Sequence, residues 1–148
     1  MERSSPVFSM PPSPPTSPPP VQRILGPYAI VQSMYSSNHV SVDLAIHRLT
    51  NVKYALKRYN AINIRGMGPD GADIIRDIGM EIQVLAQWGG KDNVVGLREL
   101  ILVQSGSNEI RIMTGEDGLY LRTQTRAAII LGEASEVILV LDYLGGKK

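Results

Sequence analysis

The sequence predicts an α+β domain: a five-stranded antiparallel sheet with one main helix packed on a face, preceded by a disordered proline-rich tail. Short runs that alternate apolar with polar or small residues are separated by polar turns. One segment places isoleucines at helical spacing, and eight of the ten prolines fall within the first 20 residues. The 148 residues, 43% of them hydrophobic, are enough for one ordinary domain with its own core.

Composition narrows the classes of function. The formal net charge of +1 gives no basic surface for general nucleic-acid binding. The lack of cysteine excludes disulfides, a thiolate nucleophile and a cysteine-ligated metal, and His39 and His47 are not spaced as a metal pair. Nothing approaches the ~18 consecutive apolar residues of a membrane span, and the N-terminus has no secretory apolar region. We therefore expect an intracellular protein, cytoplasmic or nuclear, with no nucleic-acid or membrane partner.

Residues 1–24 form the expected tail, and residues 25–148 form the domain. Proline fixes φ and removes backbone donors, so the tail suits neither a helix nor a central strand. Its serine–proline pairs could be sites of proline-directed phosphorylation. Residues 11–20 could dock on an SH3-like groove as a polyproline II helix. A plain flexible tail is the simpler interpretation of the same composition.

Three strands are expected at the start of the domain, at residues 28–34, 40–46 and 52–57. The first is β-branched, and the second alternates apolar with polar or small side chains, which is the period of a half-buried strand. Residues 35–39 and 47–51 between them are polar and turn-like. Strands joined by such short turns predict an antiparallel meander.

One helix is expected after a loop at residues 60–71, which is rich in glycine and asparagine. Asp73 is a suitable N-cap for this helix. Gly79 interrupts it, at a cost of about 1 kcal/mol relative to alanine, and Gly89-Gly90 ends it. The apolar residues at helical spacing are Ile74, Ile75, Ile78, Ile82 and Leu85.

The second half of the chain contains two further strand candidates, at residues 93–103 and 137–141. The latter is a continuous apolar run of strand length, so we expect it to be buried. Residues 104–136 form an insertion before this last strand, with candidate short strands at 120–122 and 127–131. The expected order is therefore three strands, a helix, a strand, an insertion and a last strand.

Lys57 closes the short run Tyr54-Ala55-Leu56-Lys57 at the end of the third expected strand. Taken alone, it is more simply a solvated lysine, because a lysine stem can lie on apolar surface while its ammonium reaches water. The same position would let the ammonium bind an anion such as a phosphate. The choice between these interpretations depends on the partners that the rest of the chain supplies.

Five segments resemble, in order, the N-terminal lobe (N-lobe) of a eukaryotic protein kinase, over about residues 28–146. Residues 42–45 are similar to the start of the family's second strand, and Tyr54-Ala55-Leu56-Lys57 is similar to its third. The segments similar to the C helix, to the stretch after it and to the fifth strand with the hinge are Glu81-Ile82-Gln83-Val84-Leu85, Asn93-Val94-Val95-Gly96-Leu97 and Leu139-Val140-Leu141-Asp142-Tyr143-Leu144-Gly145-Gly146. We expect a kinase of the serine/threonine type.

The resemblance implies an ATP site built around Lys57, whose ammonium would contact the α- and β-phosphates while Glu81 holds it extended. Without the resemblance, Glu81 is simply a solvated residue of a helix face. Ala55 is small enough for the adenine ring to lie against its strand. The implied ATP-binding set is Met34, Val42, Ala55, Lys57, Glu81, Leu141, Asp142 and Leu144.

The other members of this set would enclose the adenine. Val42 would cover the ring from the side opposite Ala55, and Leu141 would be the gatekeeper at the back of the pocket. The carbonyl of Asp142 and the backbone of Leu144 would hydrogen-bond the adenine edge, as the family's hinge does.

Two departures limit what the resemblance implies. Tyr35, Ser37 and Val40 stand where the family's glycine-rich loop has glycines, so phosphate cradling by the backbone should be weaker. The His-Arg-Asp catalytic loop and the Asp-Phe-Gly metal-binding motif are both absent from the sequence. We therefore expect a fragment that ends at the hinge and is inactive alone, with no catalytic residue and no Mg²⁺ ligand of its own.

Three interpretations of function remain. The first is the ATP-binding N-lobe of a kinase, whose parent transfers the γ-phosphoryl of ATP to serine or threonine hydroxyls of a protein substrate. The second is a pseudokinase-like interaction module, which the missing glycines favour. It would bind a partner through its exposed hinge-side face, with the proline-rich tail as a second docking element. The third is an unrelated small α+β domain.

Overall fold

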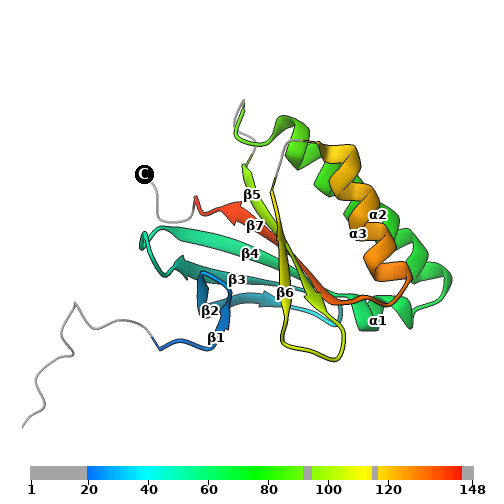
Figure 1. The fold of residues 1–148 in the computed structure, drawn as a ribbon, viewed down its shortest axis with the longest axis horizontal. Coiled ribbons are helices and arrows are strands. Elements are labelled where there is room, and N and C mark those ends of the chain that lie inside the picture. Colours follow the sequence, from blue (N-terminus) through cyan, green and yellow to red (C-terminus); the bar gives the residue numbers. More distant parts are fainter. Residues whose placement is uncertain (1–19, 92–94, 115–116, 145–148) are drawn as a thin grey trace, which may run out of the picture.

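The computed structural model describes residues 20–91, 95–114 and 117–144. This part of the chain forms one curved antiparallel sheet with two long helices side by side on one of its faces (Figure 1). The α+β class expected from the sequence is confirmed. The elements are β1 (Arg23–Leu25), β2 (Tyr28–Ser36), β3 (Val40–His47), β4 (Lys53–Asn60), α1 (Ala61–Arg65), α2 (Pro69–Trp88), β5 (Leu97–Gln104), β6 (Ile110–Met113), α3 (Gly118–Ile130) and β7 (Ala134–Asp142).

The sheet has seven strands within the described residues, in the order β1-β2-β3-β4-β7-β5-β6, and every pair of neighbours is antiparallel. The expectation of five strands was wrong, because β1 and β6 each add a short strand at an edge. The expected meander is confirmed as β2, β3 and β4. The last strand, β7, lies between β4 and β5, inside the sheet.

The first strand begins at Arg23, two residues before position 25, where the sequence places the start of the domain. Residues 1–19 of the expected tail, with its serine–proline pairs and all but the last residue of the expected docking segment, lie outside the described part of the chain. Among the helices that the structure describes, none combines the length and apolar character needed to cross a membrane.

The sheet curls until its two edges meet, and Gly26 marks the contact. Gly26 lies in the turn between β1 and β2 with a φ of 58°, a conformation that strongly favours glycine. A Cβ at this position would lie 2.8 Å from Cδ1 of Ile110 and 3.3 Å from Cδ1 of Ile112, both in β6. The turn at one edge of the sheet therefore packs directly on the strand at the other edge.

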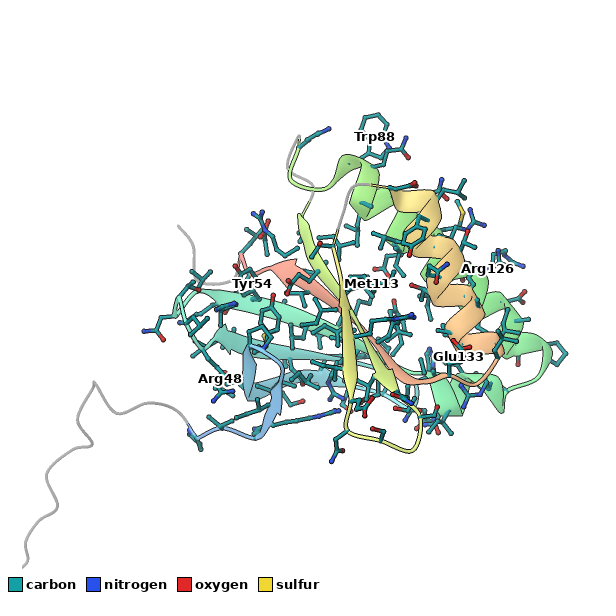
Figure 2. The ribbon with its side chains drawn as sticks, in the orientation of Figure 1. Arg48, Tyr54, Trp88, Met113, Arg126 and Glu133 are labelled. Atoms are coloured by element: carbon teal, nitrogen blue, oxygen red, sulfur yellow. The ribbon has the colours of Figure 1, made fainter. Side chains whose placement is uncertain are left out.

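Alternating side chains divide the core between the two faces of the sheet. In β7, Val137 and Leu139 pack with the helices, whereas Ile138 and Val140 pack with residues from β1, β2 and β3. We call these two sides the helix face and the inner face. Figure 2 shows side chains filling the space between the sheet and the helices. Both faces of β7 are covered, which explains its continuous apolar run and confirms it as a buried strand.

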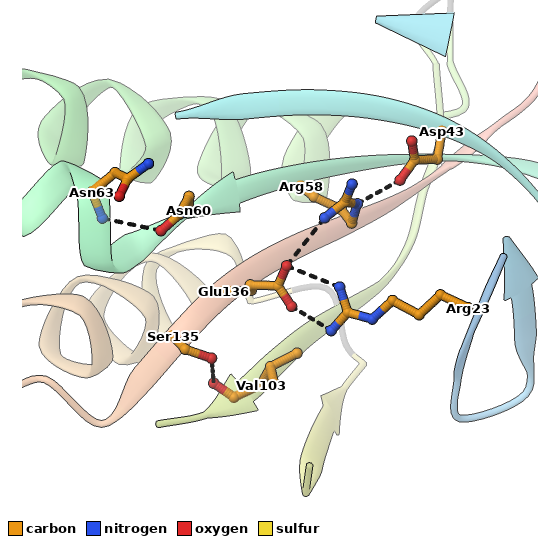
Figure 3. Close-up of polar contacts among 8 residues, drawn as sticks. All are labelled: Arg23, Asp43, Arg58, Asn60, Asn63, Val103, Ser135 and Glu136. Atoms are coloured by element: carbon orange, nitrogen blue, oxygen red, sulfur yellow. Dashed lines mark hydrogen bonds and ion pairs between the residues drawn. The ribbon is translucent and has the colours of Figure 1, made fainter. Parts of the chain in front are cut away.

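Four charged residues from four strands form a chain of ion pairs on the inner face (Figure 3). Arg23 of β1 donates to both carboxylate oxygens of Glu136 in β7, at 3.0 and 2.5 Å. Arg58 of β4 donates to Glu136 at 3.1 Å and to Asp43 of β3 at 2.5 Å. Asp43 is only 2% exposed, so its charge depends on Arg58 for compensation.

Helix α2 begins earlier than the sequence predicts. Its first residue is Pro69, after Gly68, so the expected N-cap at Asp73 was wrong. Proline suits the first helical position, because its missing N–H would have no partner there in any helix. The expected end of the helix is confirmed, since Gly89 follows its last residue and donates its N–H to the carbonyl of Leu85 at 2.8 Å.

Helix α3 occupies the insertion, so the prediction of short strands at 120–122 and 127–131 was wrong. Asp117 caps the helix, because its side chain accepts the N–H of Tyr120 at 3.0 Å. The buried side of α3 packs onto the sheet and α2, and its buried residues are Gly118, Leu121, Thr125, Ala128 and Ile129.

Two glycines bring α3 close to α2. A Cβ at Gly118 would lie 2.8 Å from the carbonyl oxygen of Gln83, and a Cβ at Gly79 would lie 2.9 Å from Cγ of Arg122. Arg122 also donates to the side-chain oxygen of Gln83 at 2.8 Å. The expected interruption of the helix at Gly79 was wrong: α2 continues through Gly79, whose missing side chain makes room for the second helix.

Helix α1 connects the sheet to α2 where the sequence predicts only a loop at residues 60–71. Asn60 ends β4 and caps α1, accepting the N–H of Asn63 at 3.0 Å. At the other end of α1, Arg65 donates to the carbonyls of Ile129 and Ala134, at 3.2 and 3.0 Å. The guanidinium therefore satisfies carbonyls at the C-terminal end of α3 and fixes α3 to the start of β7.

Candidate functional site

Lys57 and Glu81 form an ion pair between the sheet and α2. The Nζ atom of Lys57 lies 2.8 Å from Oε2 of Glu81, and the two side chains are 30% and 28% exposed. Lys57 points to the helix face because it alternates with Leu56 and Arg58, which belong to the inner face. The pair expected from the sequence is confirmed, and Lys57 is therefore more than a solvated lysine.

Tyr59 is a third member of this cluster that the sequence analysis missed. Its phenol donates to Oε1 of Glu81 at 2.6 Å, and its ring centroid lies 5.4 Å from Nζ of Lys57, within the range of a cation–π contact. Burial, and then the hydrogen bond to Glu81, raise the pKa of Tyr59, so the phenol remains a donor. The pattern that could have revealed it is its spacing of two residues from Lys57 in one strand, which puts both on the same face.

Helix α2 holds Glu81 at this place because its neighbours in the helix are anchored. Ile78 and Ile82, on either side of Glu81, are 1% and 0% exposed and pack on the helix face of the sheet. Leu85, one turn later, is partly buried against the same core. The carboxylate of Glu81 therefore emerges beside the sheet, at the level of Lys57.

Two rows of paired residues run across the sheet beside the ion pair. Val42 pairs with Lys57, and Leu44 pairs with Ala55, which in turn pairs with Leu141. Directly paired residues of neighbouring strands share a face. The structure thus brings Val42, Ala55, Lys57 and Leu141 of the implied set together on the helix face, where Lys57 meets Glu81.

Ala55 and Leu141 differ in how much of the surface they leave open. Leu141 is partly buried and packs against the helix-face core. Ala55 is half-buried, and its small side chain leaves the strand accessible between Leu44 and Leu141. This row is therefore an accessible strip of small and aliphatic side chains on the sheet.

The remaining implied residues lie at the margins of this surface. Met34 is 40% exposed, in a stretch of β2 whose pairing with β3 is irregular. Leu144 is 55% exposed and follows the end of β7. Asn93, Val94, Gly145 and Gly146 of the resembling segments lie outside the described residues.

The side chain of Asp142 is already engaged within the protein. It accepts from Nε of Arg98 at 2.6 Å and from the N–H of Gly96 at 3.1 Å, while its own N–H donates to the carbonyl of Gly96 at 3.0 Å. These bonds fix the end of β7 against the start of β5. The contact that the resemblance assigns to Asp142 is through its backbone carbonyl, which is separate from these bonds.

A cleft of about 430 Å³ opens beside the ion pair. It lies between the turn that joins β2 to β3, strand β4 and residues 74–81 of α2, and of the implied ATP-binding set it is lined by Lys57 and Glu81 alone. Its lining residues are His39, Val40, Lys57, Tyr59, Ile74, Asp77, Ile78 and Glu81. A second hollow of about 490 Å³ lies between the β5–β6 hairpin and the turn after α3, but it contains none of the implied residues.

The turn above this cleft is a tight hairpin. Ser37 donates its backbone N–H to the carbonyl of Val40 at 2.8 Å, and its hydroxyl donates to the same oxygen at 3.0 Å. Tyr35, at the first of the missing glycine positions, lies in β2 and is paired with Val42 of β3. This hairpin does not present the backbone N–H of Ser37 to a ligand, so phosphate binding would depend on Lys57.

The described residues contain no group of three or more histidine, aspartate or glutamate side chains that could hold a metal ion. No family model matches the chain, and no curated protein matches it.

Proposed function

We propose that this chain is the ATP-binding N-lobe of a protein kinase. The observation that carries the proposal is the ion pair between Lys57 on β4 and Glu81 on α2, at 2.8 Å. A carboxylate in this position keeps a lysine extended beside a cleft, where its ammonium can meet phosphate oxygens. The parent kinase would transfer the γ-phosphoryl of ATP to serine or threonine hydroxyls of a protein substrate.

The nucleotide would lie along the two rows of paired residues. Its α- and β-phosphates would meet the ammonium of Lys57, and its adenine would lie on Ala55, with Val42 on the other side of the ring and Leu141 at the back. The position of β7 between β4 and β5 supports this pose, because it brings Leu141 next to Ala55. The adenine edge would then reach the backbone of the chain just after β7.

The proposed role of the chain is binding, without phosphoryl transfer. Transfer requires Mg²⁺ held by acidic ligands and an oriented nucleophile. The His-Arg-Asp and Asp-Phe-Gly motifs that supply these in the family do not occur in the 148 residues. The protein substrate of the parent and an SH3-like partner for the proline-rich tail belong to the same proposal.

Displacement of a fluorescent ATP analogue from the purified chain tests this function. We expect ATP and ADP to displace the analogue at lower concentrations than adenosine, because Lys57 adds phosphate contacts to those of the adenine. Tripolyphosphate alone should be the weakest competitor. A chain that binds neither the analogue nor ATP, or that binds ATP no better than tripolyphosphate, would refute the proposal.

A second candidate function is a pseudokinase-like interaction module. It is favoured by a stripe of exposed apolar side chains on α2, at Met80 (46% exposed), Val84 (46%) and Trp88 (54%). They are spaced four residues apart, so they follow one side of the helix. Figure 2 shows Trp88 at the end of α2, pointing away from the sheet. Such a contiguous apolar stripe is typical of a surface that another protein covers.

The same stripe allows the two candidates to be told apart. If the stripe at Met80, Val84 and Trp88 is the functional surface, Val84→Lys should abolish association with the protein that covers it. ATP should not change that association. If ATP binding is the function, Val84→Lys should leave the displacement curve of the fluorescent analogue unchanged. Trp88 is the only tryptophan in the chain, so its emission reports burial of the stripe directly.

A further inference from the structure

The carboxylate of Glu81 receives two donors from one strand. Lys57 donates to Oε2 at 2.8 Å, and the phenol of Tyr59 donates to Oε1 at 2.6 Å. Tyr59 is only 8% exposed and belongs to the helix-face core, so its ring is fixed by packing. The phenol therefore approaches Glu81 from a rigid support, whereas the ammonium of Lys57 is carried on a flexible stem.

We propose that Tyr59 is a positioning residue that holds Glu81 toward Lys57 whether or not the ammonium is bound to a phosphate. This inference rests on the proposed binding of ATP at Lys57. In the absence of the Tyr59 hydroxyl, Oε1 of Glu81 would accept hydrogen bonds from water instead. With Tyr59 present, Glu81 is held in place and keeps the side chain of Lys57 extended toward the cleft before a nucleotide binds.

The charges around the cleft explain why a second donor is needed. Asp77 lines the same cleft and lies four residues before Glu81, and like charges at this spacing on a helix repel each other. A phosphate that approaches Lys57 brings further negative charge and competes with Glu81 for the ammonium. The phenol of Tyr59 keeps its hydrogen bond to Oε1 through this competition, because it carries no charge and is held by the core.

The matched substitutions are Tyr59→Phe and Tyr54→Phe. The first removes the hydroxyl that reaches Glu81 and keeps the ring beneath Lys57. The second removes a hydroxyl from the same strand on the opposite side, where the ring of Tyr54 lies edge-on to that of Tyr28 in the inner-face cluster. Each variant is also made in a Glu81→Ala background, and circular dichroism verifies that all variants are folded.

Two measurements are made on each variant. The first is ATP affinity, which Tyr59→Phe should lower about tenfold, the usual size for one hydrogen bond to a charged group. The second needs no nucleotide: the rate at which an amine-reactive acetylating reagent modifies Lys57, followed by mass spectrometry. The ammonium must leave Glu81 and give a proton to solvent before its nitrogen can attack the reagent and displace the leaving group. Tyr59→Phe should therefore raise this rate by loosening the ion pair, and Tyr54→Phe should leave both quantities unchanged.

The Glu81→Ala background separates positioning from general packing. If Tyr59 acts through Glu81, Tyr59→Phe should change neither quantity once Glu81 is absent. An unchanged acylation rate in the single variant, or an equal change in both backgrounds, would overturn the inference. A wild-type chain that does not bind ATP would instead refute the proposed function, and the acylation rates would still decide the role of Tyr59.

Discussion

The ammonium of Lys57 lies 2.8 Å from the carboxylate of Glu81, although the two residues are 24 positions apart in the chain. Lys57 belongs to a central strand and Glu81 to the helix that covers it. Their contact therefore depends on how α2 is positioned along the sheet. A mutual distance of this kind is a property of the fold rather than of either residue. The proposed function of the cleft beside it rests on this ion pair.

Ala55 tests the proposed place of the adenine. Ala55→Leu should lower the affinity for both ATP and adenosine by about tenfold or more, because the larger side chain would occupy the surface between Leu44 and Leu141. Ala72→Leu, at an exposed position of α2, is the matched control and should bind as the wild type does. Isothermal titration with adenosine measures this effect without any contribution from the phosphates. Equal affinity of the two variants would place the adenine elsewhere.

The two glycines of α2 should respond differently to alanine. A Cβ at Gly71 would lie 2.1 Å from the carbonyl oxygen of Ile64, which is backbone and cannot move aside. Gly71→Ala should therefore lower the free energy of unfolding by about 3 kcal/mol. A Cβ at Gly79 would meet only flexible parts of Arg122 and Arg126, at 2.9 and 3.1 Å. The free energy of unfolding of Gly79→Ala should stay within about 1 kcal/mol of the wild type. The gain in helix propensity offsets the cost of moving the arginine side chains.

Urea unfolding of the two glycine variants checks this difference. An equal loss of stability in Gly79→Ala and Gly71→Ala would contradict the structure. It would mean that the side chains of Arg122 and Arg126 cannot move aside for the added Cβ.

Glu136 should make stability depend on pH in the acidic range. Burial raises the pKa of Glu136, but the hydrogen bonds and charges of Arg23 and Arg58 outweigh it and hold the pKa below its usual value of 4.5. A carboxyl whose pKa is lowered by folding stabilises the protein above the pKa of the unfolded chain. This contribution is lost as the pH falls from about 4.5 toward the lower value in the folded state.

The comparison of Glu136→Gln with the wild type isolates this contribution. At pH 7 the variant should be less stable by about 2 kcal/mol, because Arg23 and Arg58 lose their shared partner. Between pH 5 and pH 3 its stability should fall less steeply than that of the wild type, as measured by urea unfolding. Glu109→Gln, on the exposed end of the β5–β6 hairpin, should keep the steep wild-type dependence. Parallel curves for Glu136→Gln and the wild type would contradict the role of this ion-pair chain.

The central strands and α2 could be predicted because their sequences carry the period of the structure. The alternation in β3 and the continuous apolar run of β7 follow from one and two covered faces, respectively. The pairing of Lys57 with Glu81 could be predicted as well, but only through the resemblance to a kinase N-lobe. Spacing along the chain alone does not bring a strand lysine to a helix carboxylate.

Helix α3 could not be predicted from its composition, because its apolar face is weak and includes Thr125. Its clearest signs are Asp117, which reads equally well as a turn residue, and the positions of Leu121, Ala128 and Ile129 on one side. The edge strands β1 and β6 were missed for a different reason. They are three and four residues long, and the contact of Gly26 with β6 that closes the sheet is a tertiary one.

Lys57→Met tests the central claim, that the Lys57 ammonium holds the phosphates of ATP, most directly. Lys53→Met, an exposed position of the same strand, is the matched control. The measurement is the ratio of ATP affinity to adenosine affinity, by titration of the purified chain. We predict that Lys57→Met lowers ATP affinity roughly thirtyfold and leaves adenosine affinity unchanged, so that the ratio collapses, as expected for about 2 kcal/mol from one charged contact. An unchanged ratio in Lys57→Met, or an equal loss in Lys53→Met, would contradict the claim.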